Sequence, residues 1–217
     1  MINVYLDDNI EVNKYQTLLK FINGRSDRIS VARYYQGFIN EVEFNRMQNY
    51  YEDYIQKEDK KRREQYNNNP EYKKKLMAWL KTEREIVNYF DELLKQDLEA
   101  FNCVKYDDFK GKKENRFTTS SSEFIKSEFT RVTPVTQNPV FEMSYFKIGE
   151  IYNNIVCNMK ELFDYPYKIN GVEFEDLTFY KEDINILSIC SHERFAHIKL
   201  DEDAFEQFKK LEIEYHI

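Results

Sequence analysis

The sequence predicts an α+β fold, with strands at both ends of the chain and helices in its middle. Apolar residues alternate with polar ones at the start and again near the end, which is typical of strands. Between residues 41 and 101 they recur every three or four positions, which is typical of helices. Of the 217 residues, 41% are hydrophobic and 33% are charged, so the chain can bury a core. We expect a single domain over residues 1–217.

The first 35 residues predict a strand, a helix and a second strand. Apolar residues alternate over 2–6, and Asp8 is spaced to cap a following helix with Glu11, since each side chain of such a pair accepts a backbone N–H at the helix start. Gly24 ends this helix. The β-branched and aromatic residues of 28–35 then favour a strand.

Residues 41–101 predict an antiparallel helical hairpin. The helical spacing of apolar residues covers 41–66 and then 71–101, where the second helix would be about 45 Å long. Between them, Asn69 is placed to cap the second helix and Pro70 to occupy its first position. Such a hairpin either packs on the rest of the domain or projects from it.

Residues 103–140 are predicted to be an irregular connection, because they contain Pro134, Pro139 and a run of threonines and serines. A short strand at 124–132 is the one regular element expected there. A third helix is predicted over 145–163, where large apolar residues recur at helical spacing ahead of a proline.

The C-terminal part predicts antiparallel strands closed by a short helix. Asn170-Gly171 lies between two apolar stretches, which is the strongest short-range signal for a β-hairpin. The closing helix begins at Asp201. Further strands, separated by polar turns, are expected at 177–180, 186–190 and 195–200.

The charge of the chain is unevenly distributed. The formal net charge is −7, and the last 47 residues hold 5 basic and 12 acidic side chains, so the whole excess lies there. An acidic surface repels nucleic-acid phosphates and attracts a basic protein. We therefore take Glu202, Asp203 and Glu206 as candidate partner-binding residues and expect no nucleic-acid partner. A solvated acidic surface is the alternative explanation.

Candidates for catalysis are few. Cys190 and His192 are two residues apart near a strand end, where an imidazole could activate a thiol, but an ordinary core cysteine beside a polar turn explains the same pattern. Asp7 and Asp8 are paired carboxylates of the kind that hold Mg²⁺, although the capping role of Asp8 accounts for them. His192 and His197 have opposite parity on a continuous strand, so no metal site is predicted.

Two basic clusters, at 57–63 and 73–75, fall near the turn of the helical hairpin. Together they could bind phosphates, but acidic residues interleave with them, which is typical of a solvated helix end. The sequence has no Gly-rich phosphate loop, nucleophile elbow or zinc-ligand spacing. We therefore expect no cofactor.

The cellular location is predicted from the apolar runs, the first residues and the cysteines of the sequence. No apolar run approaches the length of a membrane span, and the first residues do not resemble a signal peptide. Cys103, Cys157 and Cys190 are odd in number and widely separated, which is typical of reduced thiols. We expect a cytoplasmic protein and no membrane partner.

These features favour a protein-interaction module over an enzyme. The module would be of the immunity or inhibitor kind and would cover a basic partner with its acidic, aromatic C-terminal face. Two other hypotheses stay open. One is a thiol enzyme that uses Cys190 and His192, and the other is an assembly protein whose helical hairpin pairs with a second copy of itself.

Overall fold

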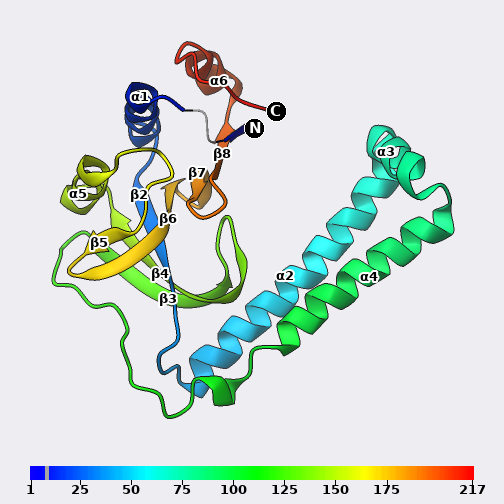
Figure 1. The fold of residues 1–217 in the computed structure, drawn as a ribbon, viewed down its shortest axis with the longest axis horizontal. Coiled ribbons are helices and arrows are strands. Elements are labelled where there is room, and N and C mark those ends of the chain that lie inside the picture. The colour runs from blue at the N-terminus through cyan, green and yellow to red at the C-terminus, as the bar shows by residue number, and fades with distance from the viewer. Residues whose placement is uncertain (8–9) are drawn as a thin grey trace. The chain divides into compact units, whose positions relative to one another are not determined.

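The computed structural model describes residues 1–7 and 10–217. By its internal contacts the chain forms two compact units, each with its own core (Figure 1). The sheet unit comprises Met1–Tyr35 and Asn115–Ile217, and the helical unit comprises Gln36–Glu114. Whether these two units fold cooperatively, as the expected single domain over residues 1–217, stays a prediction.

The sheet unit contains one antiparallel sheet, and the predicted α+β class is confirmed. Within the described residues the sheet has eight strands in the order β1-β8-β7-β6-β2-β4-β3, with β5 paired to β6. Three helices accompany it, namely α1 (Val12–Asn23), α5 (Glu150–Asn158) and α6 (Glu202–Lys209). The strands are β1 (Ile2–Leu6), β2 (Arg28–Tyr34), β3 (Phe124–Val132), β4 (Gln137–Lys147), β5 (Tyr167–Ile169), β6 (Val172–Lys181), β7 (Ile184–Cys190) and β8 (Phe195–Leu200).

The strand–helix–strand opening is present, but its two strands are not neighbours. β1 pairs with β8, and β2 lies between β6 and β4, so three strands separate β1 from β2. Gly24 is the C-cap of α1, as predicted. The N-cap is Glu11, whose side chain makes no capping hydrogen bond, and the predicted cap Asp8 lies outside the described residues.

The core of the sheet unit joins all three of its helices to one face of the sheet. Leu18 and Ile22 of α1, Ile155 of α5 and Phe208 of α6 are buried with strand residues such as Leu187. Burial of each such side chain stabilises the fold by roughly 1.5–3 kcal/mol. The C-terminal helix is therefore part of the core rather than an appendage.

The strand predicted at 124–132 within the irregular connection is confirmed as β3. The connection ends earlier than residue 140, because β4 begins at Gln137, forms a long hairpin with β3 and also pairs with β2. Pro139 lies within β4 because the register of the β3–β4 ladder shifts opposite it, between Thr130 and Val132. A proline has no N–H to donate, so it is tolerated at such an irregularity.

The third helix predicted over 145–163 is present but shorter, because α5 covers Glu150–Asn158 and Tyr145 belongs to β4. The start of α5 is set by the carboxylate of Glu123, which accepts the N–H groups of Glu150 at 2.5 Å and Ile151 at 2.9 Å. A Cβ atom on Gly149 would lie 2.2 Å from an oxygen of Glu123, so a side chain at this position would displace the capping carboxylate. The helix is capped by a residue distant in sequence.

The helical unit is the predicted hairpin with one correction. α2 (Glu41–Asn68) and α4 (Glu83–Asn102) contact each other, and α3 (Pro70–Leu80) lies between them in the chain. The helix predicted over 71–101 is broken at Lys81, whose φ is 67°, and α4 begins with a capping box formed by Thr82 and Glu85. Asn69 caps α3 as predicted.

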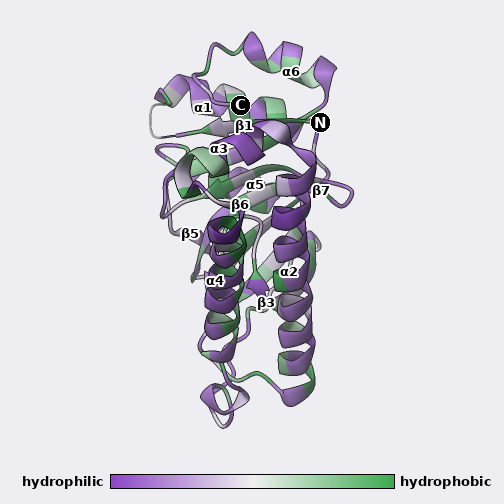
Figure 2. Cartoon of the chain, turned by 90° about the vertical axis from the view of Figure 1, so that its right-hand side faces the viewer, coloured by the Kyte–Doolittle hydropathy of each residue, from purple (hydrophilic) through white to green (hydrophobic). Residues whose placement is uncertain are grey.

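The charged surface of the helical unit is largely paired within the unit. α2 and α4 are mostly hydrophilic along their length (Figure 2). Arg62 binds Asp97 at 2.8 Å, Arg63 binds Asp59 and Asp91, and Lys73 binds Glu83 at 2.9 Å. This pairing supports the solvated-helix explanation of the basic clusters over a phosphate site.

Among the helices that the structure describes, none combines the length and the apolar composition of a membrane-spanning segment.

Candidate functional site

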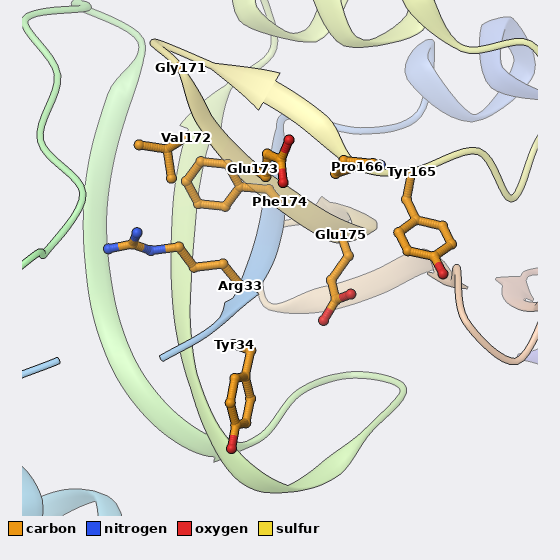
Figure 3. Close-up of a pocket in the computed structure, with 9 residues that line it drawn as sticks. All are labelled: Arg33, Tyr34, Tyr165, Pro166, Gly171, Val172, Glu173, Phe174 and Glu175. Atoms are coloured by element: carbon orange, nitrogen blue, oxygen red, sulfur yellow. The ribbon is translucent and has the colours of Figure 1, made fainter. Parts of the chain in front are cut away.

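The clearest candidate site of the sheet unit is an open pocket of about 680 Å³ beside β6, which we call the β6 pocket (Figure 3). Its volume lies within the range of about 300–1,000 Å³ that is usual for ligand pockets. Its lining combines carboxylates with aromatic rings. The lining residues are Arg33, Tyr34, Tyr165, Pro166, Gly171, Val172, Glu173, Phe174 and Glu175.

Three local features of the backbone position this lining. The Asn170-Gly171 turn, with φ of 50° and 78°, reverses the chain from β5 into β6, as predicted. On β6, Glu173 and Glu175 are two residues apart and therefore point to the same face of the strand. Tyr34 ends β2, which pairs with β6, and Tyr165 lies just before β5.

Glu175 is the central polar group of the pocket. Its side chain is 15% exposed and forms a close hydrogen bond with Nε2 of His192. The ring of His192 also packs edge-on against Tyr165, with 4.4 Å between ring centroids. In Figure 3 the Glu175 side chain leaves β6 on the side of the strand where Tyr34 and Tyr165 lie. Tyr34 is 53% exposed and Tyr165 is 42% exposed, so both rings are accessible.

A second carboxylate belongs to Asp176, which follows Glu175 on β6 and is buried. Its Oδ1 accepts the N–H of Ser191 at 2.9 Å, and its own N–H donates to Oγ of Ser191 at 3.3 Å. Burial raises the pKa of Asp176 from 3.8 to about 6, although the Ser191 N–H lowers it, and the neighbouring charge of Glu175 raises it further. Above pH 6 this end of β6 therefore carries two adjacent negative charges.

Arg33 contributes little positive charge to the pocket, because its guanidinium is paired with a buried carboxylate. Its guanidinium binds the fully buried carboxylate of Glu142 through Nε at 2.8 Å and a terminal nitrogen at 2.6 Å. Glu142 also accepts the N–H of Phe117 at 3.1 Å. Glu173 pairs across the hairpin with the exposed Lys168 at 3.4 Å. The pocket is consequently acidic and aromatic in character.

Of the residues predicted from sequence, His192 lies at this pocket and Cys190 does not line it. The Cys190 thiol is buried and lies 4.0 Å from Thr136 Oγ1. Burial raises the pKa of Cys190, and the backbone N–H of Glu193 lowers it by less. A nucleophilic thiol needs a lowered pKa and access to substrate, so this environment gives no support to thiol chemistry.

The remaining histidines lie elsewhere in the sheet unit. His197 on β8 stacks on Tyr5, with 4.8 Å between centroids, and pairs with Asn3 at 3.0 Å. Burial lowers the pKa of His197, as does the charge of Lys199. His216 lies 3.3 Å from Asp7, while Asp8 is outside the described residues. Among the residues that the structure describes, no group of three or more potential ligands could hold a metal ion.

The predicted partner-binding residues Glu202, Asp203 and Glu206 are all exposed on α6. Glu202 and Asp203 lie in the first turn of the helix, where negative charge is favoured by the helix dipole. Glu206 forms an ion pair with Lys209 at 2.6 Å. Local helix stability therefore accounts for their positions, and the β6 pocket is a separate acidic surface.

Reasoning from sequence missed the carboxylates and aromatic residues of the β6 pocket. In the sequence, Glu173 and Glu175 are two of the many acidic residues of the C-terminal segment, and only the Asn170-Gly171 turn beside them carries a local signal. Their meeting with Tyr34 depends on the pairing of β2 with β6, which are far apart in the chain. Comparisons of the chain with protein-family models, curated proteins and solved structures found no match.

Proposed function

We propose that this protein is an interaction module of the immunity or inhibitor kind, which binds a basic partner protein through the β6 pocket. The observation that carries the proposal is the grouping of Glu173 and Glu175 with the accessible rings of Tyr34 and Tyr165. Carboxylates attract a lysine or arginine side chain, and tyrosine faces add a cation–π contribution of about 0.5–1 kcal/mol each at exposed sites. The pocket thus suits a protruding basic side chain.

The charges around the pocket support a cation over an anion. Arg33 is paired with Glu142, so its charge does not offer an anion an open partner. Glu175 and Asp176 are adjacent on β6, and His192 is the basic side chain in contact with Glu175. An incoming cation therefore meets a local excess of negative charge, which also favours rapid association with a basic surface.

A peptide-binding experiment tests the proposal and its location. Fluorescence anisotropy is measured with a short labelled peptide rich in lysine and arginine, and with the same peptide in which glutamine replaces the basic residues. The wild-type protein is expected to bind the basic peptide and not the neutral one. The Glu173→Gln, Glu175→Gln double variant is expected to bind about five- to thirty-fold more weakly, for a loss of about 1–2 kcal/mol.

The matched control removes charge from the other acidic surface. This control removes three charges from α6, against two from the pocket, and leaves the pocket intact. Its substitutions are Glu202→Gln, Asp203→Asn and Glu206→Gln. This triple variant is expected to bind like the wild type. If it loses affinity while the pocket variant keeps it, the partner surface is on α6. If the wild type binds the neutral peptide equally well, or binds neither, a basic partner is ruled out.

A further inference from the structure

The free protein already holds a basic side chain in the position that the proposed function gives to the partner. His192 contacts both the Glu175 carboxylate and the ring of Tyr165. These are an acidic group and an aromatic wall of the β6 pocket. An imidazole resembles the proposed ligand group in two respects, since it is basic and can donate a hydrogen bond to a carboxylate.

The turn that carries His192 is anchored on both sides, while the His192 side chain is about half exposed. Ser191 donates its N–H to Asp176 at 2.9 Å. Arg194 binds Glu161 through two nitrogens, at 2.8 and 3.0 Å. The His192 side chain, by contrast, is 55% exposed. A change of its rotamer therefore opens Glu175 without moving the turn.

We infer that His192 is an internal competitor for the β6 pocket, displaced when a lysine or arginine of the partner binds Glu175. The inference rests on the proposed function and adds how the site is regulated. Because the imidazole is about half exposed to water, its contact with Glu175 is weak, and it lowers the partner's affinity by a modest factor, on the order of two- to five-fold. It also keeps Glu175 paired in the absence of partner, which disfavours weaker cations.

The test compares variants of His192 with a control at another exposed histidine. His192→Asn and His192→Ala remove the competitor, and both are expected to bind the basic peptide about two- to five-fold more tightly than the wild type. His216→Asn is the control, because His216 is exposed and lies outside the pocket lining. It is expected to bind like the wild type.

A second measurement follows the imidazole itself. NMR signals of the His192 ring are recorded with and without the basic peptide, and displacement is expected to move them toward the signals of a solvated imidazole. If the His192 variants bind more weakly, the imidazole is part of the binding surface and the inference is wrong. If they bind like the wild type, the imidazole does not compete. Absence of peptide binding in every variant would instead overturn the proposed function and this inference with it.

Discussion

Asp176 offers a direct test of the electrostatics of the β6 pocket. Its carboxyl group is 3% exposed, and burial raises its pKa to about 6 from an ordinary value of 3.8. Between these two pH values the folded state holds the proton that the unfolded state has lost. The free energy of unfolding therefore decreases as the pH rises through this window, and the loss is complete above pH 6.

The magnitude follows from the size of the shift. A difference of about two pKa units corresponds to about 3 kcal/mol, which is the cost of keeping the buried carboxylate charged at pH 7. Asp176→Asn removes this cost, because an amide oxygen can still accept the N–H of Ser191. Asparagine also tolerates the positive φ of 56° at this position. The variant should be more stable than the wild type at pH 7 by up to about 3 kcal/mol.

Urea unfolding of both proteins at pH 7 and at pH 4 measures the effect. The difference between them should be large at pH 7 and should shrink toward pH 4, where the wild-type carboxyl is protonated. Carboxylates distant from Asp176 contribute alike in both proteins, so they cancel from the difference. Asp183→Asn, at a fully exposed position whose ion pair with Arg28 is weak, is the control and should change stability by less than about 1 kcal/mol. A variant that is less stable at pH 7, or a difference that does not depend on pH, would refute the reasoning.

Two further predictions concern buried groups of the sheet unit. Glu142→Ala should lower the free energy of unfolding by about 3–5 kcal/mol in urea titrations, because it leaves Arg33 without its buried partner and the Phe117 N–H without its acceptor; a loss below about 1 kcal/mol would contradict the importance of this pair. A thiol reagent at neutral pH should label Cys103 and Cys157, which are exposed, much faster than Cys190, and rapid labelling of Cys190 in the folded protein would revive the thiol-enzyme hypothesis.

The strands at both ends of the chain were predictable because their signals are local. Alternation over 2–6 and the Asn170-Gly171 turn depend on residues adjacent in sequence, and both are confirmed. The break between α3 and α4 was also encoded locally, in the spacing of Thr82 and Glu85. The apolar repeat that runs through this break concealed it, since a helical period does not reveal a single residue of positive φ.

The errors at 137–140 and at the ends of the third helix have a different cause. β4 lies between two other strands, so both of its edges are partnered, and consecutive residues of it are buried, including the polar Glu142 and Ser144. Its sequence therefore lacks the simple alternation of a strand with one wet face. The start of α5 depends on Glu123, a residue more than twenty positions away, which no local pattern reveals.

The class of fold, the helical hairpin, the C-terminal strands and the acidity of the last segment follow from the sequence, because each depends on neighbouring residues or on composition. Which acidic residues face a pocket depends on tertiary structure. Pairing of β2 with β6 brings Tyr34 into the same pocket as Glu175, and the turn after β7 brings His192 to that carboxylate. Contacts between residues so far apart in the sequence depend on strand order, and strand order is set by the packing of the whole sheet.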